Sequence, residues 1–185
     1  MKMKIVKVSE MDRITKEKYI KEVKFFLKDL NLEYPLHDIW YEKMIQSMEE
    51  KFDREILLAL ENEFLLGTAV LKKSVDEKKI CTLRVKPYFQ KKGIGKQLVL
   101  KSLEFLETDK PIITVSQQKN HEFKKLLDFY GFNLEAIYWG KYLNNSCEFI
   151  YNGILMPETL IQAEQISNKD NLGSYLNISK KIIVA

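Results

Sequence analysis

The order of apolar segments predicts an α/β protein in which a central mixed β-sheet is flanked by helices (an α+β mixed sheet). Helical and strand periodicities follow one another in the order β, α, α, β, β, β, α, β, α, β, β. This order combines antiparallel hairpins with helical crossovers, so it differs from a doubly wound Rossmann fold. The chain has 185 residues, of which 45% are hydrophobic, and this is sufficient for one continuous core.

The first part of the chain predicts a strand, two helices and a hairpin. Residues 4–8 alternate in polarity as a strand does. Asp12 is placed to cap the following helix, and a second helix begins at about Asp38, each with apolar residues at helical spacing. Residues 56–60 and 64–71 are apolar runs joined by a short polar segment, so we expect a hairpin of buried strands.

The second part of the chain predicts two more helices between short strands. One helix carries Ile94, Leu98 and Leu106 on its apolar face, and a later one opens at Asn120 and ends at Gly131. The strands expected around them are residues 80–85, 112–115, 132–142 and 147–154.

Composition excludes several classes of protein. The 30 basic and 26 acidic residues give a net charge of +4, which does not by itself indicate a nucleic-acid partner and suits a polyanionic small molecule equally well. The two cysteines and two histidines have no metal-binding spacing, so no metal site is expected. The charged start has no signal-peptide core, and no run approaches the roughly 20 apolar residues of a membrane span. We expect a cytoplasmic protein with reduced thiols.

The most informative segment is residues 83–96, LRVKPYFQKKGIGK, which predicts the end of a strand, a polar loop with two glycines and the start of a helix. Backbone N–H groups converge in such a loop and the helix dipole adds positive potential, so the segment suits a phosphate or pyrophosphate. A Rossmann motif would need a third glycine where Leu98 stands, and a Walker motif would need a different glycine spacing. From Gly93 and Gly95 alone, a simple tight turn is an equally good explanation.

The context of the loop is more specific. Residues 90–95, QKKGIG, match the pattern Gln/Arg-x-x-Gly-x-Gly/Ala, and they follow a strand that ends in LRVKP at residues 83–87. Here the chain resembles the GNAT superfamily of acyl-CoA-dependent N-acyltransferases. The resemblance covers about residues 1–154 and includes Asn120 and the YGF sequence at residues 130–132.

The resemblance implies a domain organisation. Residues 1–156 would form a GNAT-like acyltransferase domain. Residues 157–185, where the periodicity weakens, would be a C-terminal extension that packs on the domain or on a partner chain, with a short strand at residues 182–184.

The resemblance also implies a coenzyme site with acetyl-CoA (coenzyme A) as the co-substrate. Backbone N–H groups of the loop would hold the pyrophosphate, and the two glycines would let the backbone approach it. The pantetheine arm would pair with the preceding strand, and a backbone N–H near Val85 would stabilise the oxyanion of the thioester. Asn120 would bind the pantetheine or act only as a helix cap. The expected coenzyme-binding residues are Leu83, Val85, Gln90, Lys91, Lys92, Gly93, Ile94, Gly95, Lys96 and Asn120.

The expected reaction is direct attack by a primary amine, of a small molecule or a protein, on the thioester. A base must first remove a proton from the amine, but residues 80–85 include no carboxylate and no histidine. The tyrosine that many family members use to protonate the thiolate is replaced by Leu127. The catalytic residues therefore stay unassigned, and the weak candidates are Glu148, Glu135, Tyr138 and Tyr142.

Cys81 is not favoured as a nucleophile, because a cysteine in a buried strand is usually inert. The acceptor is bound, in this family, mainly by the first two helices and the last hairpin. These segments offer rings that line a pocket or simply fill the core, namely Tyr34, His37, Trp40, Tyr41, Tyr138, Trp139 and Tyr142.

Two alternative functions stay open. The absent tyrosine and strand carboxylate would fit a catalytically inactive CoA-binding module of the same fold. An acyltransferase acting on aminoacyl-tRNA would need a basic stripe, and the candidates for it are Lys72, Lys73, Lys78 and Lys79. A homodimer would follow the habits of the family and not any feature of these residues.

Overall fold

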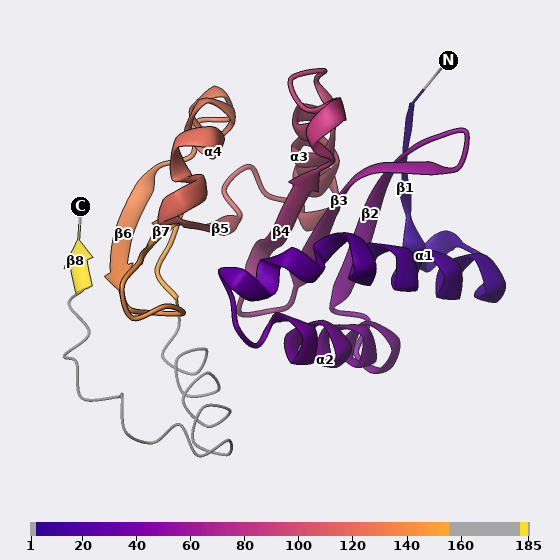
Figure 1. Ribbon diagram of the computed structural model, residues 1–185, viewed down its shortest axis with the longest axis horizontal. Helices are drawn as coiled ribbons and strands as arrows, with labels where there is room; N and C mark the ends of the chain where they lie inside the picture. Colours follow the sequence, from indigo (N-terminus) through magenta and orange to yellow (C-terminus); the bar gives the residue numbers. More distant parts are fainter. Residues whose placement is uncertain (1–2, 156–181, 185) are drawn as a thin grey trace. The chain divides into compact units, whose positions relative to one another are not determined.

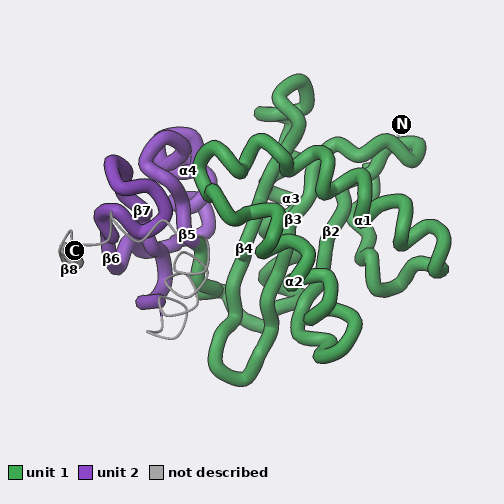
Figure 2. Tube along the Cα trace, turned by 60° about the horizontal axis from the view of Figure 1, so that its bottom comes forward, with its two compact units in different colours: residues 1–113 green, residues 114–185 purple. Residues whose placement is uncertain are grey.

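The computed structural model describes residues 3–155 and 182–184. The chain divides into two compact units, Met1–Ile113 and Thr114–Ala185, called unit 1 and unit 2 below (Figure 2). No helix among the described residues is long and apolar enough to cross a membrane.

The sheet of unit 1 is antiparallel along four strands and then continues with a parallel neighbour. The order is β1-β2-β3-β4, each strand antiparallel to the next, and β4 then pairs with β5 in parallel. The bounds are β1 Lys4–Lys7, β2 Arg54–Glu61, β3 Phe64–Lys73, β4 Lys78–Val85 and β5 Ile112–Ser116. Together with the helices, this mixed sheet confirms the predicted α/β fold class.

Helices of unit 1 pack on this sheet (Figure 1). Helices α1 and α2 share one core with Ile56, Leu58 and Leu60 of β2. Helix α3 packs on β2, β3 and β4. Successive side chains of a strand point to opposite faces of a sheet, and α3 covers the face opposite to that of α1 and α2. The bounds are η1 Val8–Glu10, α1 Arg13–Leu27, η2 Lys28–Leu32, α2 His37–Glu50, η3 Pro87–Phe89 and α3 Ile94–Leu106.

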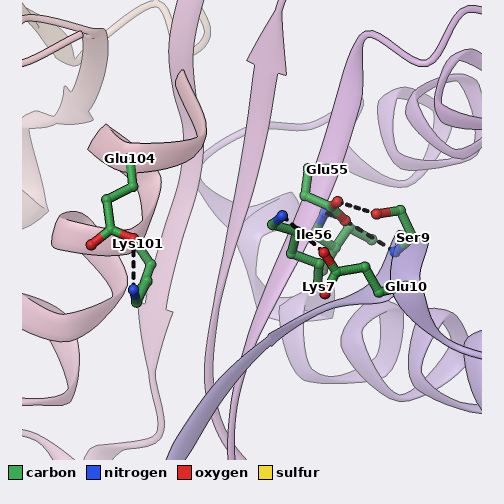
Figure 3. A network of polar contacts seen from close by, with 7 residues as sticks. All are labelled: Lys7, Ser9, Glu10, Glu55, Ile56, Lys101 and Glu104. Carbon is green, nitrogen blue, oxygen red and sulfur yellow. Dashed lines mark hydrogen bonds and ion pairs between the residues drawn. The ribbon is translucent and has the colours of Figure 1, made fainter. Parts of the chain in front are cut away.

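Polar side chains fix the ends of these elements. Asp12 caps α1 as predicted, because its carboxylate accepts hydrogen bonds from the backbone N–H groups of Ile14 and Thr15, at 3.0 and 3.1 Å. Glu55 is buried at the start of β2 and accepts from the Ser9 backbone N–H at 3.2 Å, from the Ser9 hydroxyl, and from the Ile56 N–H at 2.9 Å (Figure 3). This carboxylate therefore ties η1 to the sheet.

Within the described residues, unit 2 contains the end of β5, one helix and three further strands. Strand β7 neighbours β5, and β6 pairs antiparallel with both β7 and β8. The bounds are α4 Gln117–Phe129, β6 Leu134–Trp139, β7 Cys147–Tyr151 and β8 Ile182–Val184.

Some predicted boundaries in unit 2 are wrong. Helix α4 begins at Gln117 after Ser116, so Asn120 does not open it. Strand β6 ends at Trp139, since Gly140 has a φ of +68° and turns the chain. Strand β7 ends at Tyr151 for a similar reason, because Asn152 has a φ of +59°. A strand is present at residues 182–184 as expected, while residues 156–181 of the predicted extension lie outside the described residues, so the two-part domain organisation stays a prediction.

Candidate functional site

The C-terminal half of β4 has one edge without a neighbouring strand in the described part of the chain. Its parallel pairing with β5 covers only Lys79 and Ile80. On the other side, β3 pairs Leu71 with Ile80 and Val70 with Thr82, so the intervening residue of β4 is a β-bulge, which increases the local twist.

Backbone alternation decides which groups of β4 face the open edge. The N–H of Lys86 donates to the carbonyl of Leu66 on β3 at 2.8 Å. Because neighbouring residues of a strand direct their N–H groups to opposite sides, those of Leu83 and Val85 are directed away from β3. The two strand residues predicted to contact the coenzyme therefore offer backbone groups to an extended ligand.

Gln90 holds the loop against the end of β4. Its side-chain amide donates to the carbonyl oxygen of Val85 at 3.1 Å. The turn of η3 between them is closed by the N–H of Phe89, which donates to the carbonyl of Lys86 at 2.8 Å. Gln90 therefore has a positioning role in this structure, and the N–H of Val85 stays available at the open edge.

The glycine loop has the backbone geometry expected of an anion site. Lys91 and Gly93 have φ of +60° and +85°, and Gly93 is the N-cap of α3. The first bond of the helix is donated by Gln97 to the carbonyl of Gly93 at 3.1 Å. The N–H groups of Ile94 and Gly95 lie before this bond and point out of the helix end, where the dipole favours an anion.

The side chains around the loop play different parts. Lys91, Lys92 and Lys96 are exposed, and the ammonium of Lys92 lies 4.6 Å from the centre of the Tyr88 ring. The side chain of Ile94 is buried, so this residue can contribute only its backbone to the site. Three exposed lysines of the loop and of the first turn of α3 therefore carry positive charge next in sequence to these N–H groups.

Asn120, the last predicted coenzyme residue, is in unit 2. It lies inside α4, and its side-chain oxygen accepts a hydrogen bond from the Tyr151 hydroxyl at 2.7 Å. Burial is the main cause of the raised pKa of Tyr151, so this hydroxyl stays protonated and remains a donor. No spacing in the sequence signals this pair, because 31 residues separate its members.

The weak catalytic candidates have contrasting environments within unit 2. Glu148 is buried and lies opposite Tyr138 in the β6–β7 register, whereas Glu135 is exposed. The ammonium of Lys141 lies 5.7 Å from the ring of the buried Tyr138 and 5.1 Å from that of Tyr142.

Two positions noted in the sequence are structural. Leu127 is buried and packs in the core, so α4 has no hydroxyl at the position of the family tyrosine. The Cys81 thiol is 3.5 Å from the Arg54 guanidinium, but burial raises its pKa and disfavours the reactive thiolate.

The lysines proposed as a basic stripe are engaged within the fold. Lys72 is paired with Glu77 and Lys73 with Glu107, both at 2.8 Å. Lys79 is buried. These contacts do not favour a transfer-RNA surface at this hairpin.

Comparison with known proteins identifies the family. A family model described as an acetyltransferase (GNAT) domain matches residues 20–133, which is more than half of the chain. The chain belongs to the GNAT acetyltransferases. The resemblance stated from the glycine loop and its flanking strand is thereby confirmed, and the chain is an acyltransferase of this family.

Solved structures show the same fold at low sequence identity. A GNAT-family protein of Desulfovibrio desulfuricans is 13% identical with a TM-score of 0.64, and the match covers 81% of this chain and 97% of that one. The NatC complex bound to Gag peptide and CoA is 19% identical with a TM-score of 0.63, and the match covers 84% of this chain and 100% of that one. An acetyltransferase of Bacillus subtilis in complex with CoA is 22% identical with a TM-score of 0.54, and the match covers 83% of this chain and 100% of that one. No curated protein matches the chain in sequence.

Proposed function

We propose that the protein is an N-acetyltransferase that transfers the acetyl group of acetyl-CoA to a primary amine of a small molecule or a protein. The observation that carries the proposal is the open edge of β4, which leads through the glycine loop into the N-terminus of α3. Two of the solved GNAT relatives contain coenzyme A, which supports the same assignment here. A cytoplasmic location and a homodimer are parts of the proposal that rest on composition and on family habit alone.

The loop would bind the pyrophosphate. The N–H groups of Ile94 and Gly95 would donate to phosphate oxygens, and the exposed Lys91, Lys92 and Lys96 would add charge. The backbone of Leu83 and Val85 would pair with the pantetheine arm as with an added strand. We assign coenzyme binding to the residues named in this paragraph.

The same geometry gives the chemistry. The amine nitrogen attacks the thioester carbon, and the Val85 N–H would stabilise the charge that develops on the carbonyl oxygen. The carbon–sulfur bond then breaks, coenzyme A leaves as a thiolate, and the amine nitrogen loses its proton to a base that stays unassigned. Because the pKa of a free thiol is only about 8.5, the thiolate can leave without a strong acid, which fits the absence of the family tyrosine at Leu127.

The test is an acetyl-transfer assay with a library of primary amines, in which free thiol is measured. Gly95→Glu places a carboxylate where the pyrophosphate would bind, while a glutamate in the first turn is favourable for the helix itself. Gln46→Glu adds the same charge at an exposed position on α2 and serves as the control. We expect amine-dependent thiol release by the wild type and by Gln46→Glu, but not by Gly95→Glu.

The outcomes separate the alternatives. Binding of acetyl-CoA without transfer to any amine would favour the inactive CoA-binding module. Thiol release that is equal in the wild type and Gly95→Glu would contradict the assignment of the loop.

A further inference from the structure

Arg84 is a cation of β4 next to Val85 that the proposed coenzyme site does not use. It lies opposite Thr68 on β3, on the face covered by α1 and α2. Its guanidinium carbon is 5.2 Å from the centre of the Phe26 ring, and Lys86 places its ammonium 5.7 Å from the same ring. Two cations therefore flank one aromatic side chain beside the end of β4.

The guanidinium is only partly satisfied. One terminal nitrogen, Nη2, is 3.5 Å from a carboxylate oxygen of Asp29, whose side chain is 60% exposed, so this pair is long and solvated and contributes little. The other, Nη1, is buried and has no hydrogen-bond partner among the residues that the structure describes. A buried donor without an acceptor is costly, which favours binding of an acceptor at this point.

His37, at the start of α2, is a second buried polar group without a partner. Its side chain packs against Trp40, with ring centres 5.2 Å apart, and the residue is only 6% exposed. Neither ring nitrogen has a hydrogen-bond partner within residues 3–155 and 182–184. Burial lowers the pKa of His37, and the positive charge of Arg84 lowers it further, whereas Asp38 opposes this effect.

These observations belong together. His37 belongs to α2, one of the two helices that cover the face of the sheet on which Arg84 lies. A neutral histidine still offers one N–H donor, and an arginine offers a planar pair of donors that fits a carboxylate. Both groups on this side of the sheet can therefore donate hydrogen bonds, and Arg84 adds a permanent positive charge.

We infer that the acceptor amine also carries a carboxylate, bound by Arg84, so that the substrate class is amino acids. The inference rests on the proposed function, because it concerns the acceptor of the same transfer. The chain position supports a small acceptor: Arg84 adjoins Val85, so its guanidinium lies within one side-chain length of the backbone that would bind the thioester, which suits a molecule whose amine and carboxylate are close.

The experiment compares acetyl transfer to free L-amino acids and to their α-amides, measured as free thiol. The wild type should prefer the acids. Arg84→Gln should lower kcat/KM for the acids roughly 10- to 100-fold, as expected for loss of a hydrogen bond to a charged group, and should leave the amides unchanged. Arg13→Gln is the matched control, since Arg13 is exposed and, in the described part of the chain, is paired with Glu17 of its own helix.

Arg84→Lys keeps the charge but loses the planar pair of donors, so it should recover only part of the preference for acids. Acetyl-CoA affinity, measured in the same variants, should not change. Equal transfer to acids and amides, or a loss in Arg84→Gln that affects both equally, would overturn the inference and leave the proposed function intact. Failure of every amino acid and amide as acceptor would overturn it together with any role for Arg84 in choosing the acceptor.

Discussion

Gly67 on β3 lies opposite Val85 and gives a direct test of how β3 positions the candidate site. A Cβ added at this glycine would lie 2.8 Å from the carbonyl oxygen of Arg84 and 3.2 Å from the Cα of Val85. Both are backbone atoms, so the contact cannot be relieved by turning a side chain. Gly67→Ala should therefore push the end of β4 away from β3.

The magnitude follows from two opposing effects. Overpacking of this kind costs about 1–3 kcal/mol, and replacing glycine by alanine recovers about 0.4–1 kcal/mol by restricting the unfolded chain. The net loss in the free energy of unfolding should be about 1–2 kcal/mol. If the shift removes one hydrogen bond between the Val85 N–H and the ligand, worth about 1 kcal/mol, acetyl-CoA affinity should fall about 5-fold.

Urea denaturation and calorimetric titration with acetyl-CoA measure the two effects. Gly140→Ala is the control, because its φ of +68° costs about 1 kcal/mol while its new Cβ would meet no atom closer than 3.7 Å. It should lose similar stability and keep its acetyl-CoA affinity. An unchanged or higher stability of Gly67→Ala would refute the steric reasoning, and equal affinity losses in both variants would refute the link to Val85.

Three further predictions concern single polar groups. Glu55→Gln can keep all three contacts by donating to the Ser9 hydroxyl, so it should lower the free energy of unfolding by less than about 1 kcal/mol. Glu55→Ala should lower it by roughly 2–4 kcal/mol in urea denaturation. Similar losses in both variants would contradict this. Because the pKa of His37 is lowered in the folded state, the unfolded state binds more protons below about pH 6.5. The stability of the wild type should therefore fall as the pH drops through this range. In parallel pH-dependent melts, the stability of His37→Gln should fall less. Tyr151→Phe removes the donor to Asn120 and should cost about 0.5–1.5 kcal/mol in chemical denaturation, and no loss would mean that the bond contributes nothing.

Much of the fold could be predicted because local chemistry determines it. The Asp12 cap and the buried hairpin of β2 and β3 are encoded in consecutive residues. The start of α4 could not be predicted, because its first turn is polar and Ser116 makes no capping hydrogen bond with its side chain. The register shift of β3 beside Ala59 was also hidden, since strands buried on both faces lack alternation.

The candidate site shows the same division. The loop could be predicted because Gly93 and Gly95 stand between a strand and a helix in a recognisable order. The hydrogen bond from Gln90 to Val85 and the unpartnered nitrogen of Arg84 depend on how β4 and the elements around it pack. Such contacts leave no spacing signal in the sequence, so these roles emerged only from the structure.

The central claim is that the loop before α3 binds the pyrophosphate of coenzyme A. The most direct measurement is calorimetric titration of the purified protein with acetyl-CoA, with Gly95→Glu and the exposed Gln46→Glu variant in parallel. We expect saturable binding by the wild type and by Gln46→Glu, and loss of binding in a folded Gly95→Glu protein. Absence of binding by the folded wild type, or unchanged binding by Gly95→Glu, would contradict it.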